Sequence, residues 1–256
     1  MTAPAPGSPS IRVFDDLNSL ADAAAQLFVA AATASVKAKG SFFVALSGGS
    51  TPRTLYTLLA QPPYHDQVNW SRARIFWGDE RCVPPTDAES NYRMARESLL
   101  FHVPVSSHQV YRMPGEAADP NAGAALYEMA LRRAFALAPG QLPRFDLILL
   151  GMGPDGHTAS LFPHTAALGI TNRLVVANRV EKLHTTRLTL TYPAINAAAL
   201  VVFLVAGADK ADALAAVLQG PRQPEELPSQ GVAPANGAVI WLVDRAAAAR
   251  LAPPPA

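Results

Sequence analysis

The feature that most constrains the fold is a short apolar run that ends in a glycine-rich turn, FDLILLGMGPDGHTASLFP at residues 145–163. Residues 145–150 have the length and composition of a buried strand, and three glycines within six residues then stop it. Asp155 and His157 lie two positions apart inside this turn. Parallel α/β sheets bind their ligands beyond the carboxyl ends of the strands, so this turn is a candidate for a functional site.

Apolar runs of strand length alternate along the chain with segments whose apolar spacing indicates helices. This alternation is typical of βαβ units, and it predicts an α/β fold with a mostly parallel sheet and helices on both faces. The predicted strands cover residues 42–46, 74–77, 110–112, 145–150, 174–177, 187–191, 200–205 and 239–243. The first predicted helix is capped by Asp15 or Asp16 and extends to about residue 37. Further helices are predicted over about residues 53–60, 92–100, 121–137, 193–198 and part of 207–218, with a short last helix capped by Asp244.

The chain of 256 residues shows no internal repeat and no convincing linker, so residues 11–250 are expected to form one domain. Residues 1–10 lack the basic start and apolar centre of a signal peptide, and we expect a disordered lead-in there. Residues 251–256 are expected to be a flexible tail, and the proline-rich segment 220–234 a surface loop. The apolar run 197–206 is about half as long as the ~20 residues of a membrane span, so no membrane partner is expected.

Charge and cysteine content limit the kinds of molecule that the chain is expected to bind and the compartment that it fits. The 21 basic and 20 acidic residues leave a net charge of +1 without long runs of either sign, which gives no footprint for nucleic acid or a membrane surface. A few local Arg and Lys side chains could still hold a small anionic molecule. The single cysteine, Cys82, excludes an internal disulfide and fits a reducing cytoplasm. We expect a monomer or a weak homo-oligomer.

The segment 47–52, SGGSTP, lies between a predicted strand and a predicted helix. Its glycines would let the backbone approach a ligand, and N–H groups at a helix start bind anions. It is not a Walker A loop, because no Gly-Lys-Ser/Thr follows, and it lacks G-x-G-x-x-G. A plain strand-to-helix turn with a Ser or Thr cap is the alternative.

Two further charged groups follow predicted strands. Asp79 and Arg81, in the sequence GDER, either form a surface ion pair worth only ~0–1 kcal/mol or take part in the site. Lys210 follows the run 200–205 at the start of a predicted helix, where it opposes the helix macrodipole. A bound anion would offset that cost, and a solvated lysine is the alternative.

His157 carries the sharpest chemical signal, because an imidazole can take up and return a proton near neutral pH. A structural or solvated histidine is the more common case, but the flanking glycines argue for a purpose. The spacing to His164 does not match a zinc site, and no G-x-S-x-G nucleophile elbow is present. Cys82 is disfavoured as a nucleophile.

Six segments together resemble one known family. They are LSGGSTP at 46–52, WGDERCVP at 77–84, SNYRMARESLL at 90–100, LLGMGPDGHTASLFP at 149–163, RLTLTYPAIN at 187–196 and LVAGADKADAL at 204–214. In this order they resemble the glucosamine-6-phosphate isomerase/6-phosphogluconolactonase family, and most closely its lactone hydrolases. The resemblance spans about residues 11–250.

The resemblance implies a Rossmann-like fold shared with glucosamine-6-phosphate deaminases and, more distantly, with ribose-5-phosphate isomerase. It implies hydrolysis of 6-phospho-D-glucono-1,5-lactone to 6-phospho-D-gluconate, in the oxidative pentose phosphate pathway, without a cofactor or metal. His157 would be the general base, with Asp155, Arg81 and Asp79 beside it as further catalytic groups. The substrate phosphate would be bound by Gly48, Gly49, Ser50, Thr51, Lys210 and, as a further candidate, Arg187.

Two alternatives remain open at this stage. The deaminases resemble the chain at the same turns, but they carry Ile-Ala-Phe-Asn-Glu-Pro after Asp-Gly-His. Phe162 stands where their ring-opening glutamate would be, and Arg81 follows an Asp-Glu pair that they have without the arginine. A non-catalytic sugar-phosphate sensor is the other alternative, and such a protein could dispense with His157 or Arg81.

Overall fold

The computed structural model describes residues 10–252. Most of the expected lead-in, and residues 253–256 of the expected tail, lie outside the described residues. The boundary at residue 10 differs from expectation, because Ser10 already belongs to the first strand. At the other end, the backbone N–H of Ala252 donates to Gln219 Oε1 over 2.9 Å, so the chain is still held at this point.

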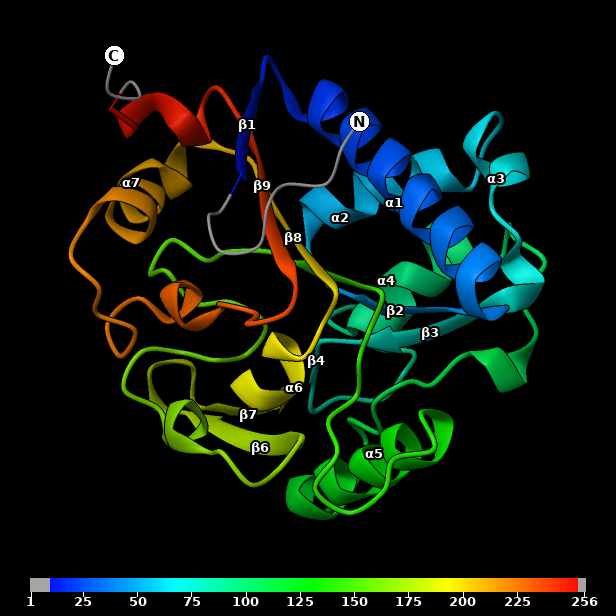
Figure 1. The fold of residues 1–256 in the computed structure, drawn as a ribbon. Coiled ribbons are helices and arrows are strands. Elements are labelled where there is room, and N and C mark those ends of the chain that lie inside the picture. Colours follow the sequence, from blue (N-terminus) through cyan, green and yellow to red (C-terminus); the bar gives the residue numbers. More distant parts are fainter. Residues whose placement is uncertain (1–9, 253–256) are drawn as a thin grey trace.

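Strands and helices alternate through the described residues, as Figure 1 shows. The strands are β1 (Ser10–Phe14), β2 (Phe42–Leu46), β3 (Ala73–Trp77), β4 (Asp79–Arg81), β5 (Leu147–Leu150), β6 (Val175–Val180), β7 (Thr185–Leu190), β8 (Leu200–Val205) and β9 (Ala238–Asp244). The α-helices are α1 (Leu17–Lys39), α2 (Ser50–Leu59), α3 (Tyr64–Gln67), α4 (Asn91–Ala95), α5 (Pro120–Ala134), α6 (Tyr192–Asn196) and α7 (Ala211–Gln219).

Six strands form one sheet in the order β1-β9-β8-β5-β2-β3, and every neighbouring pair is parallel. The strands β5 and β8 are buried along almost their whole length, as expected for a parallel sheet covered on both faces. The helices α1 and α2 pack together on one side of β8 and β9, and α7 lies on the other side (Figure 1). The expected α/β fold with a mostly parallel sheet is confirmed.

A second sheet, which the sequence did not indicate, is antiparallel and has the order β4-β7-β6. The strands β6 and β7 are joined by only four residues, a 3₁₀ turn at Glu181–Leu183 and His184 with a φ of 49°. A parallel pair needs a crossover of a dozen or more residues, so this short connection forces an antiparallel hairpin. The small sheet contains Arg81 in β4 and Arg187 in β7, which are direct partners in its register.

The long first helix shows why its boundaries could be predicted. The Asp16 carboxylate accepts a hydrogen bond from the Ser19 N–H over 2.8 Å, and the helix ends at Gly40, whose φ is 76°.

Among the described helices, α1 alone has the length and apolar composition that a membrane-spanning helix needs. Buried helices of soluble proteins also meet these two criteria. The buried face of α1, with Leu20 and Phe28, belongs to the hydrophobic core.

Several short elements differ from the sequence expectation. Residues 110–112 form no strand, and only a single bridge joins Val110 to Ile75. The edge strand β1 and the three-residue strand β4 were not predicted, because neither is a continuous apolar run. The helix expected over residues 92–100 is split into α4 and a π-helical turn at Arg96–Leu100, and the last helix is a 3₁₀ turn at Ala247–Arg250.

The segment 220–234 is held against the rest of the chain by several hydrogen bonds. The Gln230 side chain donates to the carbonyls of Ala216 and Val217 in α7, each over 3.2 Å. The Ser229 N–H donates to the Gly156 carbonyl over 2.9 Å, which ties the segment to the turn that contains His157. The expected surface loop therefore packs against the glycine-rich turn and is hydrogen-bonded to it.

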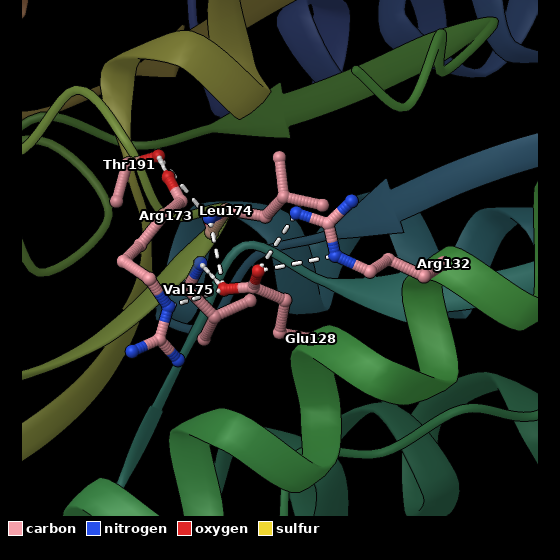
Figure 2. A network of polar contacts seen from close by, with 6 residues as sticks. All are labelled: Glu128, Arg132, Arg173, Leu174, Val175 and Thr191. Atoms are coloured by element: carbon pink, nitrogen blue, oxygen red, sulfur yellow. Dashed lines mark hydrogen bonds and ion pairs between the residues drawn. The ribbon is translucent and has the colours of Figure 1, made fainter. Parts of the chain in front are cut away.

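Glu128 of α5 anchors the small sheet (Figure 2). Its carboxylate accepts hydrogen bonds from Arg132 Nη2 at 3.0 Å, from Arg173 Nε at 2.8 Å and from the Leu174 N–H at 3.0 Å. Burial acts to raise the pKa of Glu128, but these hydrogen bonds outweigh it and hold the pKa below its ordinary value. Because β6 begins at Val175, this network attaches the start of the β6–β7 hairpin to α5.

We expect Glu128→Gln to lower the free energy of unfolding by about 1–3 kcal/mol at pH 7, since it removes charged hydrogen bonds at a buried position. The carboxylate of lowered pKa stabilises the fold above its ordinary pKa of about 4.3, and this contribution is lost as the pH falls through the lowered value. The difference between variant and wild type should therefore shrink between pH 7 and pH 3. Urea unfolding at a series of pH values measures it.

Glu97→Gln is the matched control, because Glu97 pairs with Arg93 but is 54% exposed. We expect a change of less than about 1 kcal/mol for this surface pair. Equal losses in the two variants would contradict the anchoring role of Glu128.

Candidate active site

The residues singled out in the sequence follow the carboxyl ends of four neighbouring strands. The order β8-β5-β2-β3 places these ends side by side. The segment 47–52 follows β2, Gly78 follows β3, the turn 151–157 follows β5, and Lys210 lies shortly after β8. From β2 the chain continues to β3 on one side, and from β5 it continues to β8 and β9 on the other side. Open α/β sheets bind their ligands at such a switch point, which here lies between β2 and β5.

Two adjoining cavities open at this edge of the sheet. The first, of about 300 Å³, is called the loop lobe, and it borders the segment 47–52, Asn91 and Lys210. The second, of about 420 Å³, is called the hairpin lobe, and it borders Asp155, Phe162, Lys182, Leu183 and Arg187. Both lobes are also lined by Asp79, Arg81, Pro154, His157 and Ala159.

The loop lobe has the features of an anion site. Helix α2 begins at Ser50, and its N-cap residue, Gly49, has no side chain to accept from the first N–H groups of the helix. Ser47 Oγ is buried and has no hydrogen-bond partner within residues 10–252. A β-carbon on Gly48 would overlap the Asn91 amide, so only glycine fits this close approach. The backbone is therefore exposed to a ligand where a helix starts.

Lys210 closes the loop lobe from the side of β8. It ends the 3₁₀ turn Ala208–Lys210, immediately before α7. Its Nζ lies 2.8 Å from Asp209, a carboxylate that is 66% exposed. A surface pair of this kind is weak, so an anion in the lobe can compete with Asp209 for the ammonium group.

The turn after β5 brings Asp155 and His157 into direct contact. His157 Nδ1 lies 2.5 Å from Asp155 Oδ1. Because a carboxylate only accepts hydrogen bonds, Nδ1 carries the proton and the lone pair of Nε2 is left free. A β-carbon on Gly153 would overlap the imidazole ring, which explains why the turn needs glycine there. The spacing of the two residues in the sequence did not establish this contact, and the structure shows it.

The surroundings of His157 favour the neutral imidazole. Burial lowers its pKa to about 4; the Asp79 carboxylate opposes this shift, and the cations Lys210, Arg187 and Arg81 add to it. At pH 7 the ring is therefore uncharged and able to accept a proton. These cations reach His157 from both lobes, so the histidine stands at the point where the two lobes meet.

Phe162 and Lys182 support the Asp155–His157 pair. The rings of His157 and Phe162 are stacked, with centroids 4.0 Å apart and 22° between their planes. Lys182 comes from the turn between β6 and β7, forms an ion pair with Asp155 Oδ2, and lies 5.2 Å from the centroid of Phe162. Lys182 was not identified from the sequence, because it lies in an ordinary polar turn far along the chain from Asp155.

Asp79 is a buried carboxylate that faces both lobes. Its Oδ2 accepts from Ser160 Oγ over 2.7 Å, and its Oδ1 accepts from Asn91 Nδ2 over 3.2 Å. Asn91 also donates to the Asp79 carbonyl over 2.9 Å. Ser160 and Asn91 were not singled out as individual residues, although both lie in segments that carry the family resemblance.

Glu80, between Asp79 and Arg81, points away from both lobes, as alternation along a strand requires. It accepts hydrogen bonds from the N–H groups of Asn91 and Tyr92, each over 2.8 Å, at the start of α4. Burial raises the pKa of Glu80. Its role is thus to hold α4, and with it Asn91, against β4.

Arg81 and Arg187 are paired directly across β4 and β7. Arg81 Nη1 donates to the Glu89 carbonyl over 2.9 Å. In both residues Nε is buried and lacks a hydrogen-bond partner in the described part of the chain. Burial lowers the pKa of Arg187, and the charge of Arg81 adds to this. Arg187 borders the hairpin lobe, whereas Lys210, with which it was expected to share a ligand, borders the loop lobe.

No group of three or more His, Cys, Asp or Glu side chains lies close enough to hold a metal ion within residues 10–252. Cys82 is only half-buried, and burial raises the pKa of its thiol, which disfavours the thiolate that a nucleophile requires.

Comparison with known proteins identifies consistent relatives. The family model described as glucosamine-6-phosphate isomerases/6-phosphogluconolactonase matches residues 15–241. A Nostoc sp. protein named 6-phosphogluconolactonase is 40% identical over 242 residues, which cover 94% of this chain and 98% of that protein. One of the same name from Mycobacterium tuberculosis is 42% identical over 250 residues, covering 95% and 99%.

Solved structures agree in fold. The 6-phosphogluconolactonase from Trypanosoma cruzi superposes with a TM-score of 0.84 at 30% identity, over 97% of this chain and 99% of that one. A monomeric glucosamine-6-phosphate deaminase superposes with a TM-score of 0.78 at 21% identity, over 94% and 99%. The second likeness shows a shared fold alone.

We expect an NMR titration of the His157 ring to give a pKa near 4, well below the ordinary value of about 6.5, because the imidazole is buried among cations. The His157→Gln variant removes the signal and so assigns it. A midpoint at 6.5 or above would show that the ring is not desolvated in the way described.

Proposed function

The chain belongs to the glucosamine-6-phosphate isomerase/6-phosphogluconolactonase family, and we propose that it hydrolyses 6-phospho-D-glucono-1,5-lactone to 6-phospho-D-gluconate in the oxidative pentose phosphate pathway. It is an enzyme, a hydrolase of the lactonase type. The observation that carries the mechanism is the contact between Asp155 and His157, which leaves a neutral imidazole nitrogen free between the two lobes.

The phosphate of the substrate binds in the loop lobe. The unpartnered N–H groups at the start of α2, the Ser47 hydroxyl and the Lys210 ammonium converge there. Gly48, Gly49, Ser50 and Thr51 supply the backbone of this site. A dianionic phosphate is favoured at a helix N-terminus and forms charge-assisted hydrogen bonds with lysine. Anchoring at this end sets the distance from the phosphate to the reacting carbon.

His157 acts as the general base on a water molecule. Its Nε2 takes a proton from the water while the water oxygen forms a bond to C1 of the lactone, and Asp155 stabilises the imidazolium that results. The C1–ring oxygen bond then breaks, and the proton on Nε2 passes to the departing ring oxygen. Water is thereby divided between the new carboxyl group and the new hydroxyl, and the histidine returns to its neutral form. The carboxyl group then releases its proton to solvent and becomes the carboxylate of the product.

Arg81 stabilises the negative charge that develops on the carbonyl oxygen in the tetrahedral intermediate. It borders both lobes beside His157, and its Nε has no protein partner among residues 10–252. Asp79, held by Ser160 and Asn91, orients the sugar hydroxyls from the shared wall of the lobes. Its fixed carboxylate also limits how far the surrounding cations lower the basicity of His157.

The deaminase alternative is disfavoured by the environment of Phe162. This ring is 4% exposed and stacks on His157, so the position that would hold a ring-opening acid supports the base instead. A phenyl group cannot transfer a proton to a ring oxygen. The sensor alternative is disfavoured because His157 and Arg81 are both present and both face the cavity. A cytoplasmic location and a monomeric or weakly associated state belong to the same proposal.

Replacement of the base tests the mechanism. We expect His157→Gln to lower kcat about 10²–10⁴-fold, as removal of acid–base help does elsewhere, while the fold is retained. The assay generates the lactone with glucose-6-phosphate dehydrogenase, traps the acid with 6-phosphogluconate dehydrogenase and subtracts spontaneous hydrolysis.

His164→Gln is the control, because His164 follows the same turn but is 61% exposed and borders neither lobe. It should stay within about twofold of wild type. Near-wild-type turnover of His157→Gln would reject the general-base role, and no acceleration by the wild type would reject the proposed function.

Replacement of the phosphate ligand tests the binding mode. We expect Lys210→Ala to raise KM by roughly 10–100-fold with a smaller effect on kcat, because it removes one charge-assisted contact of about 1.5–3 kcal/mol. Lys39→Ala is the control, because it removes a lysine that pairs with Asp146 outside both lobes. An unchanged KM in Lys210→Ala would place the phosphate elsewhere.

A further inference from the structure

We propose that the hairpin lobe is a second anion site, in which Arg187 together with Arg81 and Lys182 binds the carboxylate that hydrolysis creates at C1. This inference rests on the proposed function and deepens it. The substrate carries one anionic group, its phosphate, whereas the product carries two. The loop lobe would then hold both molecules by the phosphate, and the hairpin lobe would bind the product more tightly than the substrate through the new charge.

The arginine pair is the first observation behind this proposal. Arg81 and Arg187 stand directly opposite each other on neighbouring strands, where like charges are destabilising. Nε of each is buried and has no hydrogen-bond partner in the part of the chain that the structure describes. A buried donor without a partner is destabilising. An anion between the two guanidinium groups would relieve the repulsion and supply the missing acceptor.

The acidic groups of the hairpin lobe do not meet this need. Asp155 is engaged by His157 and Lys182, and Asp79 accepts from Ser160 and Asn91. With His157 neutral, three cations, Arg81, Arg187 and Lys182, border the lobe against these two carboxylates. The lobe therefore keeps an excess of positive charge, which favours an anionic ligand.

The position of His157 indicates which anion the hairpin lobe binds. The histidine lies in the wall that the two lobes share, so the carbon attacked by the water that it activates lies at their junction. A phosphate held by Lys210 occupies the loop lobe, and the carboxylate formed at C1 then emerges beside the hairpin lobe. Guanidinium groups bind carboxylates through paired, charge-assisted hydrogen bonds, whereas the uncharged lactone carbonyl gains much less from them.

The alternative is that Arg187 shares the phosphate with Lys210, as the sequence suggested. The lining of the two lobes argues against this arrangement, because Arg187 borders only the hairpin lobe and Lys210 only the loop lobe. The two assignments make different predictions for ligands that lack one of the two anionic groups, so they can be separated by binding measurements alone.

The test is isothermal titration calorimetry of wild type, Arg187→Met and Lys210→Met with two ligands. 6-Phospho-D-gluconate carries phosphate and carboxylate, and D-glucitol 6-phosphate carries the phosphate without the carboxylate. We expect Arg187→Met to weaken binding of 6-phospho-D-gluconate at least tenfold and of D-glucitol 6-phosphate by less than threefold. Lys210→Met should weaken both ligands by similar factors.

Equal weakening of both ligands in Arg187→Met would assign Arg187 to the phosphate and overturn the proposal, and so would unchanged binding of both. Arg187→Lys keeps the charge without the planar fork, and an intermediate loss for 6-phospho-D-gluconate alone is expected if Arg187→Met does not fold. Lactone hydrolysis by the wild type is measured separately. Its presence with a negative calorimetric result rejects only the second anion site, and its absence rejects the proposed function.

Discussion

Four parallel strands that end side by side constrain everything else in this molecule. Each strand must leave the sheet through a turn, and the turns after β2, β3, β5 and β8 therefore crowd along one edge. Close packing at that edge accounts for Gly48 and Gly153, where a β-carbon would overlap Asn91 or His157. The small antiparallel sheet completes the enclosure, because it carries Arg187 and Lys182 to the open side of the same edge.

The electrostatics of the enclosure follow from burial. His157 is kept neutral first because it is buried, and further because charging it would add a cation beside Lys210, Arg187 and Arg81. Asp155 and Asp79 reduce the excess of positive charge. They do not pair with the arginines, since Asp155 contacts His157 and Asp79 accepts from Ser160. A site of this kind is unfavourable without an anion, so the surrounding fold must hold it together. The Glu128 network does part of this by fixing the start of β6 to α5 (Figure 2).

Much of this could be predicted from the chain alone. The runs at 42–46 and 200–205 are buried strands because they are apolar and of strand length, and Asp16, one of the two aspartates expected to do so, caps α1. His157, Asp155, Asp79, Arg81 and Lys210 were all placed at strand ends, and they do line adjoining cavities. The edge strand β1 and the strand β4 were missed, since pairing with a neighbour, rather than local apolar pattern, makes them strands.

The sequence by itself determined the alternation of strands and helices, the glycine turns and the chemical identity of the reacting groups, because these depend on local composition and spacing. Only the tertiary structure decided how the groups are shared between two lobes. Arg187 faces Arg81 across a strand pair, Lys182 reaches Asp155 from a distant turn, and Phe162 lies beneath His157. The first two contacts join residues far apart in the chain, so their geometry is set by the register and packing of whole elements and leaves no local pattern.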